Sequence, residues 1–110
     1  MAGNYVQPGD TITLVAPYQV ASGAGLLVGS IFGVALAAAA NGAAVEARRV
    51  GVFDLDKASG AVTQGQKIYW DNTNKVVTTT STSNTLIGAA TQAAASGDAT
   101  ARVLLTGQIA

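Results

Sequence analysis

The sequence contains no cysteine and no histidine among its 110 residues. Without cysteine the chain forms no disulfide, no thiolate metal site and no thiol nucleophile. Without histidine it lacks the side chain that most often serves as a general base near neutral pH and as a transition-metal ligand. These absences exclude most hydrolase designs. We therefore expect a protein that is not an enzyme, with no catalytic residue, no cofactor and no metal ion.

Charge is also scarce. Six basic and six acidic residues cancel, and together they make up 11% of the chain, less than half of the share that is usual in soluble domains. The basic residues form no stripe with interleaved aromatics, so we expect no nucleic-acid partner. A surface with so little charge indicates either cover by other subunits or burial in a membrane.

The membrane alternative depends on residues 20–40, an uncharged stretch long enough to cross a bilayer. In a membrane helix Gly25, Gly29 and Gly33 would form one close-packing stripe. However, the flanks lack the lysine or arginine that orients a span, no aromatic belt marks either end, and alanine, glycine and serine supply most of the stretch. We prefer a pair of β-strands whose glycines lie at bends or close approaches, and expect no membrane partner.

Short segments of apolar or alternating residues, separated by turn signals, predict the fold. No helical period is sustained, which is typical of an all-β protein. We predict a small β-sandwich or partly open β-barrel with short turns and at most one or two single-turn helices. Strands are expected at residues 11–15, 26–28, 31–35, 43–48, 50–53, 67–70, 75–80, 86–91 and 99–106.

The organisation along the chain follows from the same pattern. Residues 1–9 are expected to be an N-terminal arm and residues 10–110 a single β-rich domain. Residues 67–80 give the strongest local prediction, a hairpin around a polar turn. Residues 37–40 predict a loop or a single helical turn, and residues 54–57 one helical turn capped by an aspartate.

One segment of the sequence echoes another. Residues 31–47 align without gaps on residues 86–102, with Gly33 on Gly88 and an alanine run matching an alanine run. This pattern indicates a unit used twice, made of a strand, an alanine-rich crossing, a glycine turn and a strand. Chance matching in a chain rich in alanine and glycine is the alternative.

Asp54 and Asp56 are the one close pair of carboxylates in the sequence. On a strand they would share a face, and two carboxylates can act as acid and base or hold a divalent cation. The simpler interpretation, which we prefer, is a helix-capping aspartate with a solvated neighbour.

Trp70 with Tyr69 could form a platform on which a ligand stacks, as in a carbohydrate-binding module. However, Trp70 alternates with Ile68, and a lone tryptophan in an alternating hairpin favours the core.

Six short segments, taken in chain order, are residues 5–10 (YVQPGD), 28–35 (VGSIFGVA), 51–55 (GVFDL), 68–71 (IYWD), 86–88 (LIG) and 95–98 (ASGD). Together they resemble the small capsid cement or decoration proteins of tailed phages and prophages, a group also labelled as RecA/RadA-type recombinases. The sequence departs from the family at Asp56, where a proline is expected before the lysine.

The resemblance implies a β-rich structural protein on the outer capsid surface of the virion. It would form homotrimers at local threefold positions, bind the major capsid protein, bridge capsomers and stabilise the mature shell. The recombinase label does not fit, because a strand-exchange ATPase needs a phosphate-binding loop that this sequence lacks.

The expected capsid interface is the start of the chain, which is uncharged and has no strand or helix pattern: Ala2, Gly3, Asn4, Tyr5 and Val6. We expect this arm to become ordered on the shell by adding a strand to an edge of the capsid protein. The alternatives from other classes are a membrane-inserted phage protein using residues 20–40 and a glycan-binding module on the virion.

Overall fold

The computed structural model of the chain describes residues 3–107 and 109. All secondary-structure elements formed by these residues are β-strands. The strands are β1 (Thr11–Val15), β2 (Gly25–Val28), β3 (Ile31–Ala35), β4 (Ala44–Arg48), β5 (Val50–Asp56), β6 (Lys67–Asp71), β7 (Val76–Thr78), β8 (Thr85–Ala90) and β9 (Thr100–Thr106).

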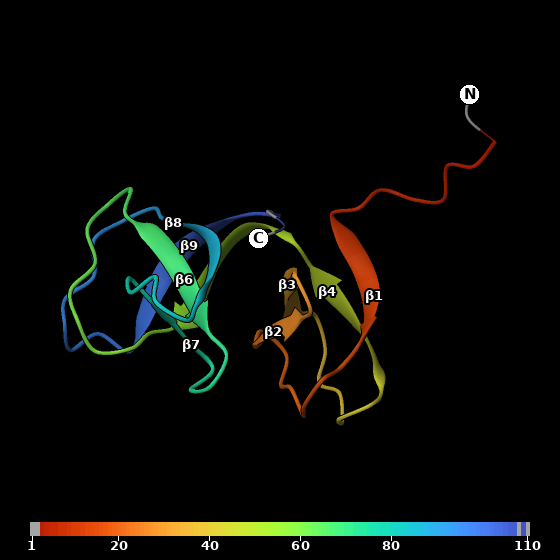
Figure 1. Cartoon of the computed structure of the whole chain (residues 1–110), viewed down its shortest axis with the longest axis horizontal. Coiled ribbons are helices and arrows are strands. Elements are labelled where there is room, and N and C mark those ends of the chain that lie inside the picture. The colour runs from red at the N-terminus through yellow and green to blue at the C-terminus, as the bar shows by residue number, and fades with distance from the viewer. Residues whose placement is uncertain (1–2, 108, 110) are drawn as a thin grey trace.

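These strands form two antiparallel sheets that lie side by side (Figure 1). The first has the order β1-β4-β3-β2 and the second the order β5-β9-β8-β6-β7. The second sheet curls, so that Lys57, just after β5, forms a parallel bridge with Val77 of β7 at the opposite edge. The predicted fold class, all-β with a sandwich or partly open barrel, is confirmed.

The hairpin predicted at residues 67–80 is present as β6 and β7, with Trp70 opposite Val77. Its turn is held by the Asp71 carboxylate, whose Oδ1 accepts hydrogen bonds from the backbone N–H of Thr73 (2.9 Å) and of Asn74 (3.2 Å). Residues 37–40 form a loop, in agreement with the first of the two predicted possibilities.

The prediction of a helical turn at residues 54–57 was wrong. β5 continues through Asp56, because β9 pairs with it along its whole length, with Asp54 opposite Arg102 and Asp56 opposite Thr100. A continuous ladder of backbone hydrogen bonds outweighs the weak tendency of one aspartate to cap a single turn. The prediction failed because β9 lies far away in the sequence.

Residues 20–40 contain β2 and β3. Gly29 begins the two-residue turn between them with φ 59°, the conformation that a type II′ hairpin requires of its first central residue. Gly33 lies where a methyl group would approach the Ala47 Cβ to 2.9 Å. The predicted bend and close approach are therefore confirmed. None of the described residues form a helix long and apolar enough to span a bilayer.

The two sheets repeat one unit. β1, β2, β3 and β4 of the first unit (residues 11–48) correspond in order and pairing to β5, β6, β8 and β9 of the second unit (residues 50–106), and β7 is an insertion. Corresponding pairs of residues, one pair from each unit, are Val15↔Ala44 with Asp56↔Thr100, Gly25↔Val34 with Lys67↔Ala89, and Ala35↔Ala47 with Ala90↔Val103.

The loops repeat as well. Val20 and Ala39 exchange two backbone hydrogen bonds, and so do Val62 and Ala94. The alignment without gaps predicted from the sequence is correct through the alanine-rich crossing but slips by one residue in the last strand. Ala47 corresponds to Val103 and not to Arg102, because the second unit has one extra residue after the alanine-rich crossing.

Each unit buries its own core, and β3 of the first unit also reaches into the second core. Phe32 and Val34 pack with the buried residues of the second unit. The rings of Phe32 and Trp70 lie with centroids 5.0 Å apart and tilted by 52°, within the range of favourable aromatic pairs. Trp70 is 2% exposed, which confirms the prediction that it belongs to the core.

Candidate interaction surface

The N-terminal segment extends away from the first sheet before β1 begins (Figure 1). Tyr5 is 69% exposed and Val6 is 86% exposed, and Gly3 and Asn4 are exposed as well. Ala2, the remaining residue of the expected interface, lies outside the described residues. Two apolar side chains and the backbone of this segment are therefore exposed.

The base of this arm is held by Arg49, which lies between β4 and β5. Its backbone N–H donates to the Asp10 carbonyl at 2.7 Å. Its Nη1 donates to the Gly9 carbonyl at 2.8 Å, and its Nη2 donates to the Gly107 carbonyl at 2.7 Å. One guanidinium therefore ties the segment before β1 to the residue that follows β9. The sequence offers only a weak signal for this role, an arginine at the break between two strands.

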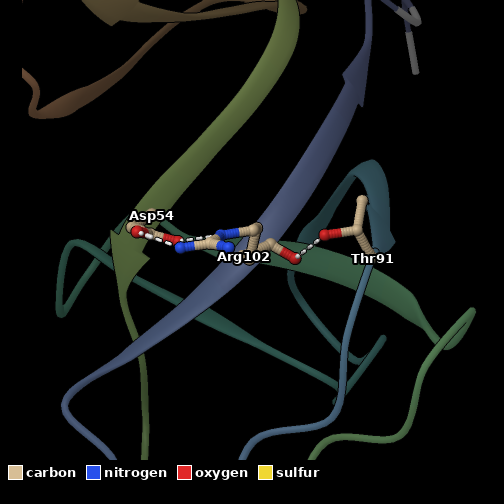
Figure 2. Close-up of polar contacts among 3 residues, drawn as sticks. All are labelled: Asp54, Thr91 and Arg102. Atoms are coloured by element: carbon tan, nitrogen blue, oxygen red, sulfur yellow. Dashed lines mark hydrogen bonds and ion pairs between the residues drawn. The ribbon is translucent and has the colours of Figure 1, made fainter.

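The outer face of the second unit carries an exposed apolar pair. Val52 (52% exposed) and Leu104 (43% exposed) lie directly opposite each other on β5 and β9. The next pair on this face is Asp54 and Arg102, joined by two hydrogen bonds of 2.9 and 3.1 Å (Figure 2). The Arg102 carbonyl also accepts a long hydrogen bond from Thr91 Oγ1.

Asp54 and Asp56, the carboxylate pair predicted from the sequence, differ in their contacts. The hydrogen-bonded Arg102 guanidinium holds the pKa of the Asp54 carboxyl below its usual value. Asp56 is exposed at the end of β5. Within residues 3–107 and 109, no three potential ligands gather around a metal position. The two side chains share one face of a strand and lie in solvent, and neither caps a helix.

The outer face of the first unit is also open. Thr13 and Glu46 lie opposite each other on β1 and β4, and Thr13 Oγ1 donates a hydrogen bond to Glu46 Oε1. Val15, which is 62% exposed, lies opposite Ala44, which is also exposed. Among the residues that the structure describes, Glu46 forms no ion pair.

A cleft of about 360 Å³ lies between the loop at residues 18–25 and β5. Tyr18 donates a hydrogen bond to the Gly25 carbonyl at 2.9 Å, and Lys75 Nζ lies 4.2 Å from the Tyr18 ring centroid. Burial raises the pKa of Tyr18. Although Trp70 lies at the bottom of this cleft, its ring is too deeply buried to stack on a sugar, so it cannot be the anchor that the glycan-binding alternative requires.

Comparison with known proteins gives one finding. A family model described as phage cement protein matches residues 6–105. The match spans both units, from the arm to β9, and leaves out residues 2–5 of the expected interface. No curated protein and no solved structure matches the chain.

Proposed function

This chain belongs to the phage cement protein family, and from that premise we propose that it binds the outer surface of a phage head and stabilises the mature shell by bridging capsomers. The observation that carries the proposal is a family match that spans both units. Residues 1–9 act as an arm and residues 10–110 as one β-rich body. The scarcity of charge supports a surface that other subunits cover.

The mechanism is mechanical. Each copy contacts the major capsid protein over a modest area, but a protein that touches several shell subunits gains from a high effective concentration at each further contact. Copies associate as homotrimers at local threefold positions, which multiplies these contacts. The arm adds a strand to an edge of the capsid protein through its backbone, and Tyr5 and Val6 supply apolar contacts.

Addition to capsids tests this function directly. The purified protein is expected to bind expanded capsids and not unexpanded ones, because only the mature lattice sets the neighbouring capsomers at the bridging distance. Co-sedimentation with each form measures the number of copies bound, and the melting temperature of the shell measures stabilisation. Equal binding to both forms, or binding without stabilisation, would contradict the proposal.

Deletion of residues 2–6 is expected to lower occupancy on expanded capsids at least about tenfold at subsaturating protein, because a loss of about 1.4 kcal/mol in binding is already tenfold. The deleted residues that the structure describes are exposed, so the melting temperature of the free protein stays unchanged. Occupancy equal to that of the full chain would show that the arm is not an interface.

A second variant separates backbone from side-chain contacts. Replacing Tyr5 and Val6 together with serine keeps the arm's backbone, so strand addition persists and we expect an intermediate loss of occupancy. A loss as large as that of the deletion would assign the binding to the two apolar side chains.

A further inference from the structure

The duplicated units allow each exposed position to be compared with its counterpart. On the outer face of the first unit, the pair Thr11 and Arg48 is polar. The corresponding pair of the second unit is Val52 and Leu104, which are 52% and 43% exposed. The same fold therefore carries polar, half-buried residues at one copy of this position and exposed apolar residues at the other. This difference indicates that the second face is covered in the assembled state.

The two outer faces carry complementary patterns along their strands. On the second unit the apolar pair is followed by the Asp54–Arg102 ion pair at the centre and by Asp56 at the far end. On the first unit the order is reversed, with Arg48 at the near end, Glu46 at the centre, and the exposed Val15 at the far end. If one face is turned end over end onto the other, apolar residues meet apolar residues and Arg102 meets Glu46.

We propose that the outer face of the second unit packs on the outer face of the first unit of another copy, with β5 over β1 and β9 over β4, antiparallel. This inference specifies the self-association in the proposed function and rests on it. Three pairs then lie opposite each other across the contact: Val52 and Val15, Leu104 and Ala44, and Arg102 and Glu46.

The Arg102 guanidinium of the second face favours this contact. Arg102 keeps its two hydrogen bonds to Asp54 and still has guanidinium N–H groups to donate to a second carboxylate. Glu46, whose hydrogen bond in the chain comes from the neutral Thr13, gains a cation. Opposite charges at the centre and apolar residues beside them fix one register and disfavour the alternative orientation, in which Val52 would face Arg48.

A second copy is the partner that fits, because the complementary face is present on every copy of this chain. Within one chain the two faces do not meet, since Val15 of the first face and Val52 of the second are both exposed. Each copy therefore contacts one neighbour through its first-unit face and another neighbour through its second-unit face. Such heterologous contacts close into a ring when the rotation permits, and a ring of three copies agrees with the proposed homotrimer.

Cross-linking between two cysteine variants tests this contact. The chain has no cysteine of its own, so Val15→Cys and Val52→Cys each introduce one reactive group at an exposed position. Packed sheets lie about 10 Å apart, which is too far for a disulfide between them. A short bismaleimide is therefore the appropriate reagent. The experiment uses the free protein in solution, without capsids.

An equal mixture of Val15→Cys and Val52→Cys is expected to give at least ten times more cross-linked dimer than either variant alone, because each cysteine faces the other and not itself. The matched control mixes Val52→Cys with Thr82→Cys, whose cysteine lies in the exposed loop before β8. A yield in the first mixture no higher than in the control would overturn the proposed contact.

A double substitution provides the converse test. Val52→Thr with Leu104→Arg copies the first unit's residues into the second, and the fold already accepts them at the equivalent positions. Self-association measured by sedimentation is expected to weaken at least tenfold, with the melting temperature changed by less than about 4 °C. Unchanged association would overturn the contact.

The outcomes also separate this inference from the proposed function. Cross-linking in solution by a protein that adds to no capsid would keep the self-contact and refute the capsid role. Addition to expanded capsids without the cross-link would refute the self-contact alone.

Discussion

Replacing Gly88 with alanine is expected to destabilise the protein by at least about 3 kcal/mol, at the upper end of what overpacking costs. A Cβ atom built on Gly88 would overlap the Leu104 carbonyl oxygen and lie 2.9 Å from the Leu104 carbonyl carbon. Both are backbone atoms, so no side-chain rotation relieves the clash. β8 must move away from β9, which breaks the pairing of Gly88 with Leu105 and of Ala89 with Leu104.

Denaturant unfolding measures this loss, and thermal unfolding should show a melting temperature lower by roughly 10 to 20 °C. Gly97→Ala is the matched control, because no atom lies within 4 Å of its added Cβ and its φ is not left-handed. That variant is expected to stay within about 0.5 kcal/mol of the original protein. If the two alanine variants were equally stable, the close approach of β8 and β9 would be wrong.

A smaller loss of stability is expected at Gly33, the corresponding glycine of the first unit. A Cβ on Gly33 would meet the Ala47 Cβ at 2.9 Å and the Arg48 carbonyl oxygen at 3.3 Å. The Ala47 Cβ is fixed to its backbone, but the overlap is smaller than at Gly88, so a smaller separation of β3 and β4 relieves it. Gly33→Ala should therefore cost less than Gly88→Ala and more than Gly97→Ala, in the order of the three clash distances.

The strands could be predicted from the sequence because their signals are local. Alternation and turn residues locate β1 and the hairpin of β6 and β7 within a few positions. The partner of each strand could not be predicted in the same way, because β2 and β3 lie between β1 and its partner β4 in the chain, and β6, β7 and β8 lie between β5 and its partner β9. The error at residues 54–57 has this origin: the sequence around Asp54 contains no information about β9.

The repeat shows the same limit. Gly33 and Gly88 could be matched because glycine is required at both close approaches, and the alanine runs follow them. The single extra residue after the crossing left no trace in a segment of small residues. Burial reveals it, since Ala47 and Val103 are both buried whereas Arg102 is exposed.

The exposure of the N-terminal segment could be predicted from its lack of pattern, and its role as an interface stays a prediction; the contacts of Arg49 and the outer faces could not be predicted. Arg49 donates hydrogen bonds to backbone carbonyl groups of two distant segments. Because every residue has such a carbonyl, the sequence does not show which residues Arg49 binds. The outer faces depend on which residues lie opposite each other. Val52 and Leu104 are far apart in the sequence, and their contact appears only when the register of β5 and β9 is known.

Replacing Trp70 with alanine is the second change with a large expected effect, about 3 to 5 kcal/mol of stability, the usual cost of truncating a buried large aromatic side chain. The ring is 2% exposed, packs on Phe32, and its Nε1 donates to Asn72 Oδ1 at 3.0 Å. Its loss opens a cavity where the first unit meets the second. Asn72→Ala, which removes only the hydrogen-bond acceptor, should cost about 1 kcal/mol. Calorimetry follows both variants, because Trp70 is the sole tryptophan.

A double-mutant cycle with Gly25 tests whether the ring really joins the two units. A Cβ on Gly25 would lie 2.8 Å from Trp70 Cη2 and 2.9 Å from Phe32 Cζ, so Gly25→Ala alone should be destabilising. In the Trp70→Ala protein the ring no longer occupies that space and Phe32 can turn into the cavity. The cost of Gly25→Ala should then fall by at least half, a coupling of about 1 kcal/mol, typical of residues in direct contact. Additive effects would mean that Trp70 does not pack on Gly25. Another contact would then have to hold the two units together.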